Sequence, residues 1–230
     1  MITFLKKKIL DVIYGSDLKP KISNYLDINV PVCVPPRMIS RFIISGWALR
    51  FSAPRNRPDR VRLIGAVISG IWDLFSYKIT KSNKYRDFQL RYKKLYPWYK
   101  TQQPLSFDLM IRAKSVGRGN SKTFEEFEYN VLHRWDQLYA EIRSNGYKCA
   151  EELGLPLSNN IEVAIGRSGG IYLVDGKHRL IMAQLLNLDY VPVVVNVIHK
   201  NFYNKLQRES GSSSIISLLN KKFNNHRRQL

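Results

Sequence analysis

The sequence contains very little cysteine and histidine. Its 230 residues include two cysteines, Cys33 and Cys149, and four histidines. The cysteines stand far apart, and the chain has no HExxH and no paired Cys/His spacing, which argues against a protein-built zinc site and against a disulfide framework. Isolated thiols are typical of proteins in a reducing compartment, so we expect a cytoplasmic protein.

The chain also lacks a long hydrophobic run near its beginning. Residues 1–14 mix apolar side chains with Lys6–Lys8, so this segment resembles neither a signal peptide nor a membrane span. Its apolar residues share one helical face and Gly15 follows, which predicts a short amphipathic helix. Such a helix either docks on its own domain or lies on an anionic membrane surface. We expect no transmembrane segment.

Acidic residues are scarce. Eighteen Asp and Glu face 37 Lys and Arg, which gives a formal net charge of +19. This excess attracts polyanions such as nucleic acid or an anionic membrane, although a basic surface that only confers solubility predicts the same composition. A hydrophobic content of 44% with 12% aromatics argues against global disorder. The length suits one domain with an elaborated end.

The clearest local pattern lies between residues 171 and 187. Ile171–Val174 is a short β-branched run that predicts a buried strand, and Asp175-Gly176 ends it. Beyond this break, apolar residues recur every three or four positions, which predicts a helix as far as Asn187. The first turn of that helix contains three consecutive basic residues: Lys177, His178 and Arg179.

Positive charge is unfavourable at the start of a helix. The macrodipole makes each cation there cost about 0.3–1 kcal/mol, and the first backbone N–H groups lack partners. A phosphate relieves both problems, because it accepts from the N–H groups and pairs with the cations. We therefore interpret this turn as an anion site, with Arg179 suited to bidentate contact and Gly176 to a close approach of the phosphate.

Each of these residues also has a purely structural interpretation. Asp175 is either the N-cap of the helix or a carboxylate that holds Mg²⁺ beside bound phosphates. His178 either donates to phosphate and transfers protons, or is a hydrogen-bonded structural histidine. Lys177 either contacts phosphate or lies in solvent. The sequence leaves these alternatives open.

The same residues resemble the ParB/sulfiredoxin superfamily, in which a G-x-H-R or G-E-R-R turn binds nucleotide phosphates. Gly176–Arg179 matches the G-C-H-R of sulfiredoxins, and Asp175–Arg179 matches the D-G-H-H-R of archaeal free-serine kinases, in both cases except at Lys177. The ParB box matches only at Gly176 and Arg179. The likeness covers roughly residues 134–200, about a third of the chain. It includes the helix-then-glycine Leu138–Gly146 and the apolar run Tyr190–Val195.

The resemblance implies an α/β (α+β) fold with a small mixed sheet and packed helices. It implies a nucleotide (ATP, ADP or CTP) with Mg²⁺, and phosphoryl transfer to a small hydroxyl or saccharide acceptor. The implied nucleotide-binding residues are Gly176, Lys177, His178 and Arg179, the implied catalytic residues are Asp175 and His178, and Asp175 is the implied metal ligand. A reductase of the sulfiredoxin type is excluded because the attacking cysteine is absent. The base for the acceptor hydroxyl stays open among four carboxylates: Glu141, Glu151, Glu152 and Glu162.

Three regions are expected along the chain. Residues 1–120 form a basic, partly helical extension packed on the core, residues 121–205 form the ParB/sulfiredoxin-like core, and residues 206–230 form a basic, Ser/Asn-rich tail. A capping box, Thr123 with Glu126, predicts the start of a long helix in the core. Gly70–Asp73 resembles the G-x-W-D segment of ParB-like proteins, or is simply a core tryptophan in a turn.

Residues 78–99 interleave basic and aromatic side chains. Such a run is typical of single-stranded nucleic-acid binding, so a nucleic-acid-binding or nuclease-like protein is the alternative function. Tyr85, Phe88 and Tyr92 nevertheless fall on one helical face, which favours rings buried in the protein.

Overall fold

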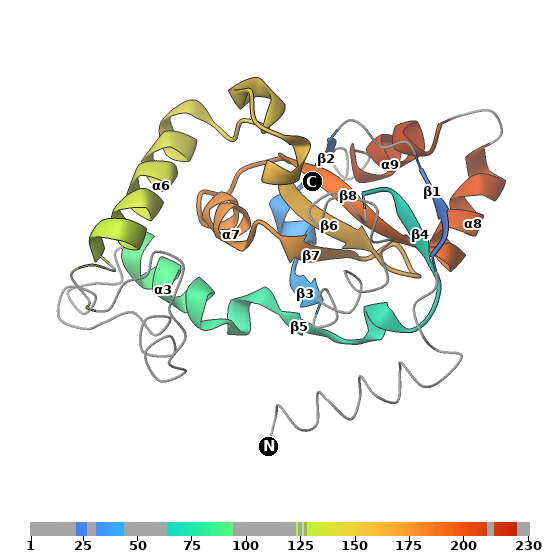
Figure 1. Cartoon of the computed structure of the whole chain (residues 1–230), viewed down its shortest axis with the longest axis horizontal. Helices are drawn as coiled ribbons and strands as arrows, with labels where there is room; N and C mark the ends of the chain where they lie inside the picture. The colour runs from blue at the N-terminus through green and yellow to red at the C-terminus, as the bar shows by residue number, and fades with distance from the viewer. Residues whose placement is uncertain are drawn as a thin grey trace, which may run out of the picture.

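The structure is a computed structural model that describes residues 22–26, 31–43, 64–93, 123, 126, 128–210 and 214–224. The helix expected at residues 1–14, the end of the tail and residues 94–99 of the basic and aromatic run lie outside these ranges. The described residues form a mixed α/β fold, as the sequence predicts (Figure 1).

One mixed sheet organises the molecule. Its order is β1-β4-β8-β6-β7-β3-β5, and β2 pairs with β8 as well. Strand β8 runs parallel to β4 and β6, strand β3 runs parallel to β7, and the remaining pairs are antiparallel. The strands are β1 (Ile22–Tyr25), β2 (Val32–Val34), β3 (Arg41–Ile43), β4 (Ala66–Ile68), β5 (Ser76–Lys78), β6 (Ile161–Ile165), β7 (Ile171–Asp175) and β8 (Val191–His199).

Strands from the C-terminal half, β8, β6 and β7, lie together at the centre of this sheet, and strands from the N-terminal half flank them on both sides. Strands β1 to β5 come from the region predicted as an N-terminal extension, yet β4 lies along β8 and β3 along β7. The sheet has eight strands, which is larger than the small sheet expected from the resemblance. The predicted boundary at residue 120 lies outside the described ranges. The central strand β8 is a Val-rich run buried over most of its length, as expected for a strand covered on both faces.

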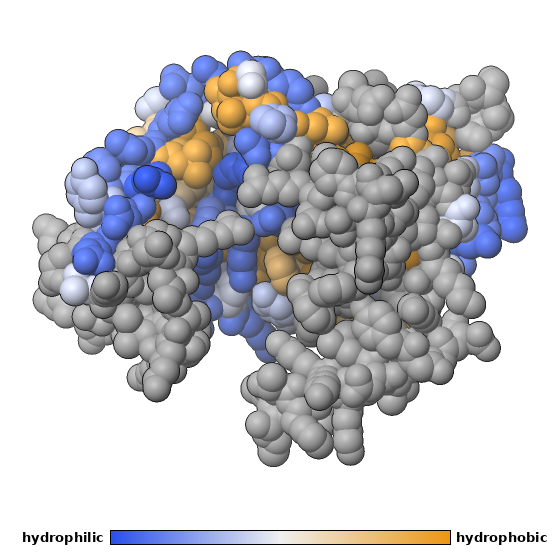
Figure 2. Space-filling view, viewed as in Figure 1, coloured by the Kyte–Doolittle hydropathy of each residue, from blue (hydrophilic) through white to orange (hydrophobic). Residues whose placement is uncertain are grey.

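Helices pack at both ends of the sheet. Helix α7 lies beside both α3 and α6. Helix α6 carries hydrophilic side chains on its outer side (Figure 2). Helix α8 packs on β8 and β4, and α9 packs on β2. Their bounds are α3 (Asn83–Tyr92), α6 (His133–Asn145, after a π-helical turn η5, Glu128–Leu132), α7 (Lys177–Leu185), α8 (Lys200–Ser210) and α9 (Ile215–Asn224). The 3₁₀ turns are η1 (Pro36–Met38), η2 (Trp72–Leu74), η3 (Ile79–Lys81), η6 (Glu151–Leu153) and η7 (Leu157–Asn159).

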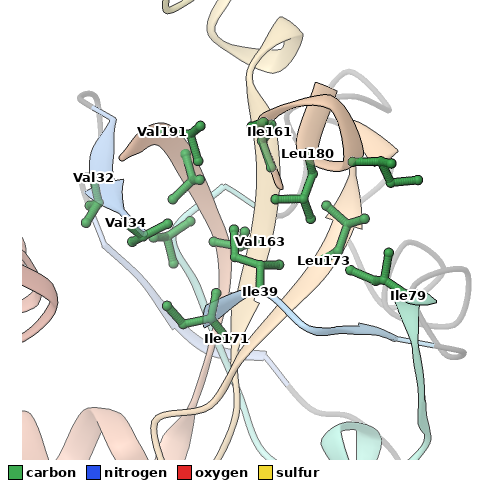
Figure 3. Close-up of a cluster of buried hydrophobic side chains, with 14 of the residues drawn as sticks. Val32, Val34, Ile39, Ile79, Ile161, Val163, Ile171, Leu173, Leu180 and Val191 are labelled. Carbon is green, nitrogen blue, oxygen red and sulfur yellow. The ribbon is translucent and has the colours of Figure 1, made fainter. Parts of the chain in front are cut away.

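The main core lies between the sheet and the helices. Figure 3 shows Val163 and Leu173 of the sheet and Leu180 of α7 in this cluster, all fully buried. A second, smaller cluster contains alternate residues of the same strands, including Ala164 and Val174, which therefore point to the opposite face. Leu180 lies one turn into α7, so its burial in the core holds the start of this helix in place.

Several local predictions are confirmed. The Glu126 N–H donates to Thr123 Oγ1 at 3.3 Å, which is the N-cap half of the predicted capping box, and α6 ends at Asn145 before Gly146. Phe88 of α3 is buried, and Tyr85 and Tyr92 pack against the core, which favours the buried-ring interpretation for this part of the basic and aromatic run. Within the described ranges, no helix is long and apolar enough to cross a bilayer.

Candidate functional site

The strand, turn and helix around Gly176 form as the sequence predicts. Strand β7 ends at Asp175, and Gly176 occupies the N-cap of α7 in the left-handed region, with φ 82° and ψ 25°. A Cβ at this position would lie 2.9 Å from Ile161 Cα, so glycine is needed for its conformation and for the close contact with β6. The helix begins directly afterwards, with Leu180 N–H bonded to Gly176 O.

Asp175 does not cap this helix. Its Oδ1 accepts from the Gly176 N–H at 2.7 Å, which stabilises the turn itself, and the residue is exposed. No side chain caps the N-terminus of α7 at Gly176. The interpretation of Asp175 as a conventional N-cap is therefore wrong. Its assignment as a metal ligand and a catalytic residue stays a prediction.

The three basic side chains of the first turn point in different directions. Lys177 reaches toward β3 and β5, His178 lies between α3 and α6, and Arg179 contacts the loop that follows α6. This divergence follows from helix geometry, because successive residues are rotated by about 100°. The three side chains therefore do not form a single cage around one point, and each has its own surroundings.

Lys177 is half-buried beside two aromatic rings. Its Nζ lies 5.3 Å from the ring centroid of Phe42 and 5.5 Å from that of Tyr77, and 3.4 Å from Tyr77 Oη. Burial lowers the pKa of Lys177 below its usual value. Among the described residues, no carboxylate lies within ion-pair distance of it. The interpretation of Lys177 as a solvent-exposed lysine is therefore wrong.

His178 is packed between α3 and α6. Its ring stacks on Phe88 with a centroid distance of 5.7 Å and lies 4.8 Å from the ring of Trp135. Its Nε2 is in hydrogen-bond contact with Lys84 Nζ, which itself lies 5.2 Å from the Trp135 ring centroid. These contacts favour the structural interpretation of His178, in which the imidazole joins three helices.

Arg179 reaches the loop between α6 and β6. Its Nη2 donates to Asn160 O at 3.3 Å. It lies beside Tyr147, where burial raises the pKa of the phenol and the nearby guanidinium acts in the opposite direction. No carboxylate pairs with Arg179 in the part of the chain that the structure describes.

An open pocket adjoins Arg179. It encloses about 410 Å³, counted out to its mouth, between the end of α6 and residues 146–159. Leu153 and Leu155 on its wall are 46% and 45% exposed, and Figure 2 shows apolar side chains gathered on the surface over η6. The apolar wall consists of Leu138, Ile142, Ala150, Leu153 and Leu155, and the polar groups are Glu141, Tyr147, Lys148, Asn159 and Arg179.

The four candidate bases lie in different places. Glu162 is opposite Asp175 in the β6–β7 pairing, at a bulge, and its buried carboxylate accepts from Asn196 Nδ2 at 2.7 Å. Glu141 lines the pocket beside Arg179. Glu151 accepts from Asn160 Nδ2 at 3.0 Å, and Glu152 accepts from the Cys149 N–H at 3.2 Å. These last two contacts hold the loop, which leaves Glu162 and Glu141 as the better candidates.

The carboxylates do not gather into a metal cluster. In the described residues, no group of three or more His, Cys, Asp or Glu side chains could hold a metal ion. Glu162 is the residue opposite Asp175 in the β6–β7 pairing. Mg²⁺ in proteins is held by one or two carboxylates together with phosphate oxygens, so the predicted Mg²⁺ depends on a bound phosphate.

A second charged cluster surrounds Asp73, and only part of it was predicted from the sequence. Asp73 of the Gly70–Asp73 segment is 4% exposed and accepts from the Arg167 N–H at 2.8 Å and from Arg167 Nη2 at 2.7 Å. His199 Nε2 donates to Gly70 O at 2.9 Å, and its Nδ1 accepts from the Asn201 N–H at 3.1 Å. These two bonds assign the neutral Nε2–H tautomer to His199.

This cluster ties together three distant segments. Trp72 packs on the His199 ring with a centroid distance of 5.7 Å, so η2, the β6–β7 hairpin and the end of β8 meet here. Burial alone raises the pKa of Asp73, but the hydrogen bonds from the side chain and backbone of Arg167 outweigh it and lower the pKa. The tetrapeptide was visible in the sequence, whereas Arg167, 94 residues away, carried no local signal.

Comparison with known proteins leaves the chain without an assigned family. No family model matches it, and neither a curated protein nor a solved structure does. The resemblance to the ParB/sulfiredoxin superfamily therefore depends on the residues of the β7–α7 turn and its surroundings.

Proposed function

We propose that the protein binds a phosphate-bearing ligand, a nucleotide by the resemblance of its turn, at the start of α7. One observation carries this proposal. Lys177 and Arg179 stand at a helix start without a side-chain cap, and neither pairs with a carboxylate of the described residues. Unpaired cations at the positive end of a helix are unfavourable without an anion.

Because the basic side chains diverge, we place the phosphate on the backbone of the turn and not inside a cage of side chains. The ligand lies on the backbone N–H groups of the first turn, flanked by Lys177 on one side and Arg179 on the other. His178 supports the turn through its stacking on Phe88 and Trp135 and leaves phosphate contact to its neighbours. Gly176 lets the phosphate approach the backbone because it has no side chain.

The pocket beside Arg179 suits the rest of the ligand. Its apolar wall with a few polar groups is typical of small-molecule sites. A nucleoside contacts Leu138 and Ile142 there while its phosphates extend to the helix start. Phosphoryl transfer to a hydroxyl acceptor uses Mg²⁺ held by Asp175 and a base, Glu162 or Glu141.

Calorimetry tests the binding step. The full chain is titrated with ATP, ADP and CTP, with and without Mg²⁺, and at least one of them is expected to bind. Arg179→Gln is expected to weaken that binding, whereas Arg208→Gln on the exposed surface of α8 is the matched control. If none of the three nucleotides binds the wild-type protein, the proposal is wrong.

Nucleic acid is the second candidate ligand, favoured by the net charge of +19. The rings of α3 are packed in the core, so stacking on bases has less support than the charge. Filter binding of single-stranded DNA and RNA at two salt concentrations tests it, because contact with several phosphates makes affinity fall steeply with salt. Affinity confined to mononucleotides contradicts it.

A further inference from the structure

We infer that Asn145 is a site of spontaneous modification, at which the side-chain amide converts to aspartate and isoaspartate through a cyclic imide formed with Gly146. Water is the one reactant besides the chain. Three observations at the end of α6 carry the inference: an exposed Asn-Gly pair, a glycine N–H without a described partner, and open space around that glycine. The modification itself does not depend on the proposed function.

The Asn145-Gly146 pair is accessible at the end of a helix. Asn145 is the last residue of α6, Gly146 follows it as the C-cap, and both residues are exposed. The Gly146 N–H makes no hydrogen bond within the part of the chain that the structure describes. The nitrogen that has to attack the side chain is therefore not held by another group, and no bond has to break before it reacts.

Gly146 also has the conformational freedom that closure of the imide ring requires. Its φ is 74° and its ψ is 178°, and a Cβ added there would meet nothing within 4 Å. A helical ψ at Asn145 turns the next nitrogen away from the side-chain carbon, so closure needs a rotation about the Cα–C bond of Asn145. A glycine in open surroundings absorbs that rotation in its own φ and ψ. The end of a helix is also where the helix frays.

The reaction balances without any oxidant or reductant. The Gly146 nitrogen gives its proton to solvent base and attacks Cγ of Asn145, and the side-chain nitrogen leaves as ammonia, which gives the cyclic imide. Water then opens the ring. Opening at the main-chain carbonyl gives isoaspartate, and opening at the side-chain carbonyl gives aspartate. The sum is one asparagine and one water giving one carboxylic acid and one ammonia.

The product changes the side of α6 that faces the pocket. Glu141 lines the pocket and stands four residues before Asn145, so the two side chains lie on the same face of the helix. A carboxylate at position 145 therefore repels Glu141, and it also places negative charge at the negative end of the helix. Both effects loosen the last turn of α6. The same carboxylate opposes an anionic ligand beside Arg179, and this consequence rests on the proposed function.

Two variants at this position test the consequence. Asn145→Asp introduces the charge of the product, and Asn145→Gln is the matched control because it keeps a neutral amide. Asn145→Asp is expected to melt at a lower temperature than Asn145→Gln, by a difference that shrinks in high salt, and to bind nucleotide severalfold more weakly. Equal melting of the two variants contradicts the effect on α6. Absence of nucleotide binding in the wild type contradicts the proposed function alone, because ageing of the protein decides the modification.

Ageing of the full chain tests the modification. The protein is incubated between pH 6 and pH 9, folded in buffer and unfolded in urea, and the products at each asparagine are quantified by peptide mass spectrometry. We expect aspartate and isoaspartate at Asn145, at a rate that rises with hydroxide concentration and lies within severalfold of the rate in urea. Isoaspartate identifies the imide route, because direct hydrolysis of the side chain gives aspartate alone.

Two other asparagines are the internal controls. Asn83 is exposed but is followed by Lys84, and Asn196 is 4% exposed. Both are expected to stay unmodified over the period in which Asn145 converts in the folded protein. The inference is overturned by equal modification at Asn83, by aspartate without isoaspartate at Asn145, or by a rate at Asn145 in the folded protein that is far below the rate in urea.

Discussion

Two parts of the molecule use the same kinds of side chain in opposite ways. In the first, the buried Asp73 carboxylate accepts a short hydrogen bond from Arg167, and both Arg167 and His199 donate to Gly70 O. In the second, the basic residues at the start of α7 point apart, and Lys177 and Arg179 pair with no carboxylate of the described residues. The two regions differ in whether their charged groups are paired, and this difference separates a structural role from the proposed ligand-binding role.

A charged group that is already hydrogen-bonded within the protein binds a ligand less readily, so pairing distinguishes a structural group from a candidate ligand-binding group. The Asp73 carboxylate already accepts from the backbone and the side chain of Arg167, and a ligand would have to displace these bonds. At the start of α7, no carboxylate of the described residues competes with a ligand for Lys177 or Arg179. The following predictions set the two regions against each other, beginning with the largest effect.

Asp73→Ala is expected to lower the free energy of unfolding by about 3 kcal/mol, because it leaves Arg167 without its buried partner. Chemical denaturation of the full chain measures this change. Binding of nucleotide to the folded fraction is expected to stay intact, because the cluster is not part of the proposed site.

Glu209→Gln is the matched control for this substitution. Its carboxylate is 50% exposed and lies 3.9 Å from Lys205, so its loss changes stability by less than about 1 kcal/mol. Equal losses in the two variants would contradict the structural role of the Asp73 cluster.

Gly176→Ala is expected to cost about 2 kcal/mol of stability and to weaken phosphate binding. A left-handed alanine alone costs about 1–2 kcal/mol, and the added Cβ meets the backbone of Ile161 at 2.9 Å. Gly154→Ala measures the cost of a left-handed alanine alone, because Gly154 has φ +65° and nothing within 4 Å of its added Cβ. Denaturation curves of both variants, compared with wild type, give the contribution of the contact. A loss no larger in Gly176→Ala than in Gly154→Ala argues against the close packing.

Arg179→Gln is expected to reduce nucleotide binding by about 1.5–3 kcal/mol, the range of hydrogen bonds to charged groups. The unliganded protein is expected to lose no more than about 1 kcal/mol, since the described contact is one bond to Asn160 O at 3.3 Å. Melting curves with and without nucleotide separate the two effects. A large loss of stability without ligand would assign Arg179 to the structural class, alongside Arg167.

Stability is expected to rise with pH in both regions, but in different pH windows. The lowered pKa of Asp73 contributes stability that is present above the unfolded value, about 3.9, and is lost as pH falls through the lower folded value. The lowered pKa of Lys177 makes the unfolded state bind more protons between the folded value and about 10.4, so stability rises with pH in that window. Asp73→Asn and Lys177→Met are expected to remove these slopes from denaturation measured across pH. If the slopes persist in the variants, other titratable groups cause the pH dependence.

The parts of the fold that were predictable are those encoded by neighbouring residues. The β7–Gly176–α7 unit and the N-cap bond at Thr123 follow from local patterns, and the structure has them. Turn and helix signals act over a few residues, so a single sequence contains them in full.

The remaining features depend on which strands become neighbours. The pairing of β4 with β8 and of β3 with β7 has no local signature, and neither does the bond from Arg167 to Asp73. The candidate site was predictable as a turn of charged residues. The separate directions of its side chains were not, because they depend on the positions of α3, α6 and β5 around it.

The central position of β8 has a consequence for synthesis of the chain. Strands β2, β4 and β6 all pair with β8, which among the described strands is the last to leave the ribosome. At about 5–20 residues per second, the edge of β4 waits on the order of ten seconds for its parallel partner. During that interval, the apolar strands of the nascent chain have unpaired edges, which are prone to aggregation. Folding of this sheet is therefore expected to be completed late and to depend on protection of the growing chain by chaperones.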